Sequence, residues 1–132
     1  MRVLIAGVPQ AGKTTLAAQF DAICGDVPIR QTDSLIGLME WSETSEEVSR
    51  WLDESAFLIE GVAVPRALRK WLARNESGKP CDVVIWIDAP CVALTDGQAR
   101  MAKGCRTVFD SIRPELERRG VSIWRHHWRE RS

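Results

Sequence analysis

The stretch VLIAGVPQAGKTTLAAQF, residues 3–20, decides the fold of this chain. Its apolar beginning predicts a buried strand over residues 2–6, and the apolar side chains at helical spacing further on predict an amphipathic helix over 13–23. Between the two, residues 7–14 match the pattern G-x-x-x-x-G-K-S/T. A strand, a glycine loop and a helix in this order predict a loop that binds phosphate groups at the helix N-terminus.

Each part of the glycine loop has a role in holding a triphosphate. Gly7 and Gly12 can adopt backbone angles closed to other residues, so successive N–H groups can turn inward around an anion. We expect the Lys13 ammonium to reach the β- and γ-phosphates and the Thr14 hydroxyl to bind Mg²⁺. The residues expected to contact ATP are Gly7, Pro9, Gln10, Ala11, Gly12, Lys13, Thr14 and Thr15.

The rest of the chain alternates short apolar runs with amphipathic helical stretches, which is typical of a parallel sheet with crossover helices. Further strands are expected at 27–32, 57–61, 82–88 and 121–124. Further helices are expected after the N-cap pair Asp33-Ser34, after the capping-box pattern of 44–47, and from Pro65 onward. The last helical stretch has four boundary signals: an N-cap at Thr95 or Asp96, an interruption at Gly104, a kink or restart near Pro114, and an end at Gly120.

The composition fits one domain and excludes several classes of protein. The chain has 132 residues, 45% of them hydrophobic, which predicts a single domain over 1–124 followed by a basic tail over 125–132. No apolar run approaches the length that spans a bilayer. Four cysteines without a C-x-x-C pair predict reduced thiols rather than a zinc site. We therefore expect a cytoplasmic protein with no membrane partner.

The charges balance over the whole chain, 18 Lys and Arg against 18 Asp and Glu, but they do not balance within each half. Residues 1–64 carry 4 basic and 10 acidic side chains, whereas 65–132 carry 14 basic and 8 acidic ones. No global field therefore recruits nucleic acid or a membrane. A polyanionic ligand is expected to take backbone donors and one cation from the first half, and its other cations from the second.

Two acids compete for a place at the metal. Mg²⁺ bound by one hydroxyl needs a further oxygen ligand or an acid behind its water, usually at the end of a strand beside the first one. Glu60 follows the apolar run 57–59, and Asp88 follows the run 83–87. Both would open onto the carboxyl edge of the sheet, so from the residues alone either acid can serve.

Together with the glycine loop, the segment Phe57-Leu-Ile-Glu60-Gly61 followed by Pro65-Arg66 resembles the small P-loop kinases, the group of adenylate, shikimate, gluconate and polynucleotide kinases. In adenylate kinases the third strand runs into Asp-Gly, an aromatic residue, Pro and Arg. Here Glu60-Gly61 stands in that place, and Pro65-Arg66 follows two residues later. The resemblance implies a three-layer α/β fold with a five-stranded parallel sheet in the order 2-3-1-4-5, helices on both faces and a short lid. It favours Glu60, acting through water, at the metal, and it places Arg66 at the acceptor.

Asp33 is the candidate for activating the acceptor. It lies 20 residues after Lys13, at the end of the second expected strand. Members of this group that act on hydroxyls carry an acid at this place, and this chain resembles them in that respect. A carboxylate near the γ-phosphate can accept the proton of an attacking hydroxyl, and it would repel a phosphate acceptor. Trp41, expected to end the helix after Asp33, can form a wall of the acceptor pocket. In the alternative reading, Asp33 is only the N-cap of that helix.

Three cations recur at three-residue spacing after the fourth expected strand: Arg100, Lys103 and Arg106. Related kinases place a short lid with arginines there. We expect Gly104 to act as a hinge, and Arg100 and Arg106 to close over the transferred group and neutralise the charge that develops on it. A solvated basic helix face is the alternative.

The expected function is that of an ATP-dependent kinase that uses Mg²⁺ and transfers the γ-phosphate to a hydroxyl of a nucleoside, a polynucleotide 5′ end or a small metabolite. The residues expected to be catalytic are Lys13, Asp33, Arg100 and Arg106. One alternative is a nucleoside or deoxynucleoside monophosphate kinase. Another is a module that binds or hydrolyses ATP as a switch and has no small-molecule acceptor.

Overall fold

The computed structural model describes residues 2–7, 29–35, 38–87 and 95–126. In chain order its elements are β1 (Arg2–Gly7), β2 (Ile29–Gln31), the 3-10 helix η1 (Thr32–Leu35), α2 (Trp41–Trp51), β3 (Phe57–Glu60), α3 (Val64–Arg74), β4 (Val83–Ile87), α4 (Asp96–Arg118) and β5 (Ser122–His126).

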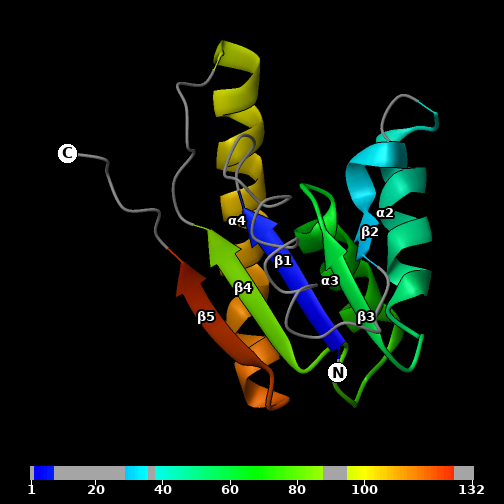
Figure 1. The fold of residues 1–132 in the computed structure, drawn as a ribbon. Helices are drawn as coiled ribbons and strands as arrows, with labels where there is room; N and C mark the ends of the chain where they lie inside the picture. Colours follow the sequence, from blue (N-terminus) through cyan, green and yellow to red (C-terminus); the bar gives the residue numbers. More distant parts are fainter. Residues whose placement is uncertain (1, 8–28, 36–37, 88–94, 127–132) are drawn as a thin grey trace.

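The five strands form one parallel sheet in the order β2-β3-β1-β4-β5 (Figure 1). The predicted fold class and strand order are therefore confirmed. β1 lies between β3 and β4 because its residues are apolar and buried on both faces, as a central strand requires. Ile5 pairs with Glu60 on one side and with Ile85 on the other. The carboxyl ends of β1, β3 and β4 consequently meet at one edge of the sheet.

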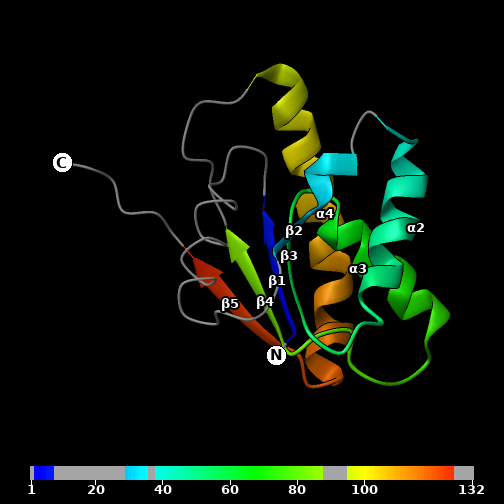
Figure 2. The same cartoon turned by 45° about the vertical axis from the view of Figure 1, so that its right-hand side comes forward.

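The helices α2, α3 and α4 lie on the same side of the sheet (Figures 1 and 2). α3 and α4 pack on β1, and α2 packs on α3. Within this core, Trp86 of β4 stacks on Phe109 of α4 with ring centroids 4.5 Å apart. The opposite face of β1 is buried as well, at Val3 and Ile5. The helix expected over 13–23 lies outside the described residues.

The end strands differ in length from the expected ones. β5 was expected over 121–124, and it runs from Ser122 to His126 because it pairs with β4 along its whole length. The expected strand 27–32 is described only as Ile29–Gln31, and Thr32 already belongs to η1.

α2 begins at Trp41, before the capping-box pattern that was expected to start it at Thr44. The box is formed four residues earlier by Glu40 and Glu43, and Glu43 Oε1 accepts the N–H of Glu40 at 3.3 Å. Thr44 is instead buried inside the helix, where its N–H bonds to the carbonyl of Glu40. The predicted start was therefore wrong, because an earlier Glu pair caps the helix.

α4 is one continuous helix of 23 residues, so the predicted interruption at Gly104 was wrong. Thr95 is the N-cap, and its Oγ1 accepts the N–H of Gln98 at 3.2 Å. The helix continues through Gly104 and Pro114 because its buried stripe does not break; that stripe is Ala102, Cys105, Val108, Phe109, Ile112 and Leu116. Burial of these side chains outweighs the helix cost of one glycine and one proline. Gly120, at a φ of 89°, follows the C-cap Arg119 as expected.

Candidate functional site

The carboxyl edge of the sheet gathers the ends of the strands that carry the candidate residues. Gly7, the first residue of the glycine loop, is the last residue of β1 and pairs with Ile87. The remaining loop residues lie outside the described part of the chain: Pro9, Gln10, Ala11, Gly12, Lys13, Thr14 and Thr15. Because β1 is flanked on both sides, the loop starts at the middle of the edge, where the strand order reverses and parallel sheets bind ligands.

Glu60 ends β3 beside this starting point. Its register partner is Ile5, two residues before Gly7, and the next N–H, of Gly61, donates to the carbonyl of Ile5 at 3.2 Å. Gly61 has a φ of 142°, a conformation that favours glycine. The Glu60 side chain is only 2% exposed. Burial of a charged carboxylate costs free energy unless cations or hydrogen-bond donors contact it.

Glu60 fits the chemistry of a magnesium site. Mg²⁺ prefers oxygen ligands and is held by one or two carboxylates together with waters and substrate phosphates. Among the described residues no three His, Cys, Asp or Glu side chains gather into a metal cage. The rival acid, Asp88, follows β4 directly and lies outside the described residues.

Asp33 lies within η1, on the connection from β2 to α2. The preceding residue, Thr32, is fully buried, and its Oγ1 accepts the N–H of Ala63 at 3.4 Å. This bond ties η1 to the β3–α3 connection, which follows Glu60. Asp33 is therefore inside a 3-10 turn and is not the N-cap of a following helix, and Trp41 starts α2 and does not end a helix.

Arg66 lies in the first turn of α3, just after Pro65. Its Nη1 donates to Sγ of Cys105 on α4 at 3.7 Å. The same thiol lies 3.5 Å from the carbonyl oxygen of Val62, to which it donates. Arg66 and Cys105 thus connect α4 to the β3–α3 connection at the carboxyl edge of the sheet.

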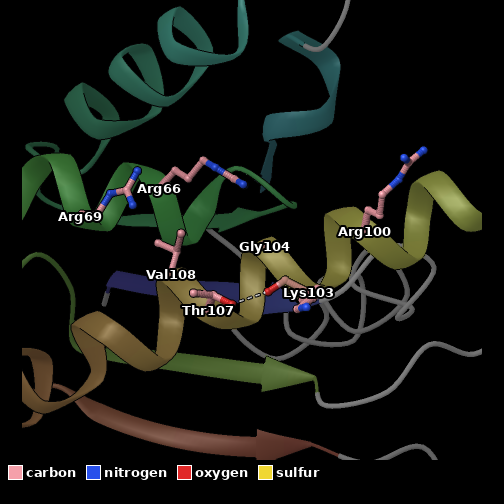
Figure 3. A pocket seen from close by; sticks show the side chains of 7 residues that line it. All are labelled: Arg66, Arg69, Arg100, Lys103, Gly104, Thr107 and Val108. Carbon is pink, nitrogen blue, oxygen red and sulfur yellow. Dashed lines mark hydrogen bonds between the residues drawn. The ribbon is translucent and has the colours of Figure 1, made fainter.

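A pocket of about 460 Å³ opens between α3 and α4, and we name it the α3–α4 groove (Figure 3). Its lining residues are Arg66, Arg69, Arg100, Lys103, Gly104, Thr107 and Val108. Two arginines come from α3 and the other five residues from α4 (Figure 3). The Thr107 hydroxyl donates to the carbonyl of Lys103 at 2.9 Å.

The groove brings together some of the predicted cations and separates others. Arg66 and Arg100 both line it, although they were assigned to different roles, whereas Arg106 is not among its lining residues. On α4 the lining is continued one turn after Lys103 and Gly104 by Thr107 and Val108, each four residues further on. Arg69 was missed, although it stands one turn after Arg66 on α3.

Three of the cations that line the groove differ from several other arginines of the described residues. In the described residues, Arg69, Arg100 and Lys103 form no ion pair. The arginines that pair with a described carboxylate are Arg2, Arg30, Arg50, Arg74, Arg113, Arg118 and Arg119. The residues that line the groove, all from the described part of the chain, include no acid.

Comparison with known proteins finds solved structures that are similar to this chain. No protein-family model and no curated protein matches the sequence. The shikimate kinase from Acinetobacter baumannii, solved in complex with shikimate, is similar over 99% of this chain and 84% of its own, with 13% sequence identity and a TM-score of 0.47. The fold class given above rests on the strand order and strand directions of this chain.

Two buried cysteines lie in the core of the described residues. Cys81 and Cys105 are free thiols, and both are buried. Burial raises the pKa of the Cys81 thiol to about 12, with the guanidinium of Arg2 opposing the rise. Cys24 and Cys91 lie outside the described residues. None of the helices found in the described ranges is both long and apolar enough to cross a bilayer.

Proposed function

We propose that this protein is an ATP-dependent kinase that transfers the γ-phosphate to a hydroxyl group of its acceptor. The observation that carries the proposal is the start of the glycine loop at Gly7, the carboxyl end of the central strand, with the buried Glu60 ending the adjacent strand. Such a loop followed by Lys13 and Thr14 is the arrangement that holds a triphosphate in P-loop proteins.

In this proposal the loop residues from Gly7 to Thr15 bind the phosphates through backbone N–H groups, and Lys13 contributes its charge. The Thr14 hydroxyl and, through water, Glu60 hold Mg²⁺, with Asp88 as the other acid at the same edge. When bound, Mg²⁺ neutralises negative charge on the β- and γ-phosphate oxygens.

Asp33 accepts the proton of the acceptor hydroxyl as that oxygen attacks the γ-phosphorus, and the bond from phosphorus to ADP breaks. Trp41 and Arg66 contact the acceptor. Arg100 and Arg106 counter the charge on the group in transfer. Because α4 is continuous through Gly104, these cations move only if α4 moves as a whole or its first turns unwind.

A nucleoside monophosphate kinase is the second candidate, favoured by the cations of the α3–α4 groove. One transfer experiment separates the two. The chain is incubated with ATP labelled at the γ-phosphate, with Mg²⁺, and with nucleosides, 5′-hydroxyl oligonucleotides, small hydroxylated metabolites or nucleoside monophosphates. The proposal expects label in a phosphate ester, and label in a nucleoside diphosphate supports the second candidate.

Two control variants make the transfer experiment decisive. Lys13→Ala removes the ammonium of the loop and is expected to abolish transfer. Lys70→Ala removes a lysine of α3 outside the proposed site and should leave transfer unchanged. Hydrolysis of ATP without transfer to any acceptor would contradict the kinase proposal and favour a switch module.

A further inference from the structure

We infer that Thr32, together with Cys105, is a positioning residue of the proposed reaction and fixes η1, the segment that contains Asp33, on the β3–α3 connection. The inference rests on the proposed function, in which Asp33 accepts the proton of the acceptor hydroxyl. The point of attachment is the peptide group between Val62 and Ala63. Thr32 holds this group at its N–H, and Cys105 of α4 holds it at its carbonyl.

The first support is the pair of hydrogen bonds on this peptide group. Its N–H, which belongs to Ala63, donates to Oγ1 of Thr32 at 3.4 Å. Its carbonyl oxygen, which belongs to Val62, accepts from Sγ of Cys105 at 3.5 Å. A peptide group is planar and rigid, so a side chain that holds one end also limits the movement of the other end. One rigid group therefore connects η1 to α4.

The second support is the burial of the groups that take part. Thr32, Ala63 and Cys105 are each 0% exposed, and Val62 is 4% exposed. Bulk water has no access to such a place, so an N–H that loses its acceptor there is left unsatisfied. Valine has the same shape as threonine and would fill the same space without the hydroxyl. The hydroxyl of Thr32 therefore contributes hydrogen bonding, which valine in the same space would lack.

The third support is the place of this peptide group in the fold. Glu60, the proposed metal acid, ends β3, and the N–H of the next residue, Gly61, donates to the carbonyl of Ile5 at 3.2 Å. Ile5 lies two residues before Gly7, where the glycine loop starts. The connection is thus tied to β1 at one residue and to Thr32 two residues further on. These bonds fix η1 relative to the metal acid and to the start of the loop.

The contact matters for phosphoryl transfer because this reaction depends on the placement of its groups. A protein accelerates it mainly by positioning and by electrostatic stabilisation, and a displacement of about 1 Å can lower the rate about 100-fold. Thr32 directly precedes Asp33, and both belong to η1, which has only four residues. A shift of the backbone at Thr32 therefore also shifts Asp33. We expect the hydroxyl of Thr32 to act on kcat, whereas MgATP binding belongs to the glycine loop.

Kinetics of Thr32→Val and Thr32→Ser in the full chain test the inference, with the acceptor that takes the label in the transfer experiment. Valine keeps the shape and removes the hydroxyl, whereas serine keeps the hydroxyl. We expect kcat to fall about tenfold or more in Thr32→Val and to return close to the wild-type value in Thr32→Ser. The affinity for MgATP, measured by calorimetric titration, should stay unchanged in both. Thr44→Val is the matched control, because Thr44 is equally buried and its Oγ1 has no hydrogen-bond partner among the described residues.

Hydrogen exchange tests the contact itself and needs no acceptor. It is followed at the Ala63 amide in a nitrogen-15 correlation spectrum of the full chain. We expect this amide to exchange slowly in the wild type and in Thr32→Ser, and about tenfold or more faster in Thr32→Val. Equal exchange of the Ala63 amide in the wild type and in Thr32→Val would overturn the inference.

Cys105→Ala tests the other end of the peptide group. We expect faster exchange at Ala63 and a lower kcat in this variant. Cys81→Ala is the matched control, since Cys81 is equally buried but lies beside the start of β1, at the amino edge of the sheet, and it should change neither quantity. Cys105 also contacts Arg66, so the KM for the acceptor is expected to rise as well in Cys105→Ala. Should Thr32→Val fail to fold, absence of both effects in Cys105→Ala would overturn the inference.

The outcomes separate the inference from the proposed function. Transfer with the same kcat in the wild type and in Thr32→Val would overturn the inference and leave the kinase standing. The same holds for an equal loss of kcat in Thr32→Ser or in Thr44→Val, and for a loss of MgATP affinity as large as the loss of kcat. Absence of transfer by the wild-type chain would overturn the proposed function and with it the role of Thr32 in the reaction. Slow exchange at Ala63 would then show that the peptide group is held without a kinase reaction.

Discussion

The guanidinium of Arg66 on α3 lies in the space that Gly104 on α4 leaves free, with Nη2 only 3.1 Å from the place where a Cβ of Gly104 would stand. The two residues are far apart in the sequence, and their contact joins the first turn of α3 to the middle of α4. Gly104 was expected to be a hinge. Gly104 instead lies inside a continuous helix and packs against the Arg66 side chain.

Gly104→Ala should show how freely the Arg66 side chain can move. Alanine adds up to about 1 kcal/mol of helix stability, and the atom it meets is the far end of a flexible side chain, which can move. We therefore expect an unchanged or higher melting temperature for Gly104→Ala. Gly97→Ala on the same helix is the matched control, because its Cβ would meet nothing within 4 Å. A large drop in melting temperature for Gly104→Ala, with none for Gly97→Ala, would show that the Arg66 side chain cannot move away from the added methyl group.

Glu60→Gln should act on magnesium rather than on the fold. The substitution keeps the shape of a side chain that is 2% exposed and removes its charge. Loss of an outer ligand of this kind typically lowers metal affinity about 10- to 100-fold. We expect the Mg²⁺ concentration for half-maximal transfer to rise by that factor, while Glu54→Gln, an exposed partner of Arg30, leaves it unchanged. If the Mg²⁺ concentration for half-maximal transfer is unchanged in Glu60→Gln, the acid that serves the metal is Asp88 and not Glu60.

Cys81 should make the fold sensitive to alkali. Its folded pKa is raised to about 12 from an ordinary value of 9.0, because the buried thiol resists ionisation. Between these two values the unfolded chain releases the proton and the folded chain keeps it, so stability falls as the pH rises through this window. We expect the free energy of unfolding of the wild-type chain to fall more steeply there than that of Cys81→Ala, measured by urea denaturation. If the free energy of unfolding falls equally with pH in the wild-type chain and in Cys81→Ala, the pKa of Cys81 is not raised in the folded state.

The parts of the fold that the sequence predicts well are those with strong local patterns. β1, β3 and β4 are short apolar runs, and Thr95 carries a complete capping box, so the structure agrees with the prediction there. The start of α2 was mispredicted because two capping patterns lie four residues apart and burial of Thr44 favours the earlier one. The break at Gly104 was mispredicted because the apolar stripe of α4 outweighs a local helix breaker.

The site was harder to predict than the fold. Glu60 could be placed because it ends a strand next to β1. Arg69 and Thr107 could not, because nothing in the local sequence says which faces of α3 and α4 meet, and only that meeting makes the groove. The predicted grouping of Arg100 with Arg106 counted spacing along the chain, whereas the groove selects side chains by the direction in which they leave the helix.

Calorimetric titration of the full chain with MgATP tests the central claim most directly, since the whole account depends on a glycine loop at Gly7 that holds a triphosphate. We expect saturable heat with the wild-type chain, a large loss of affinity in Lys13→Ala, and wild-type affinity in Lys70→Ala. Absence of binding in the wild-type chain, or equal affinity in the wild type and Lys13→Ala, would contradict the account.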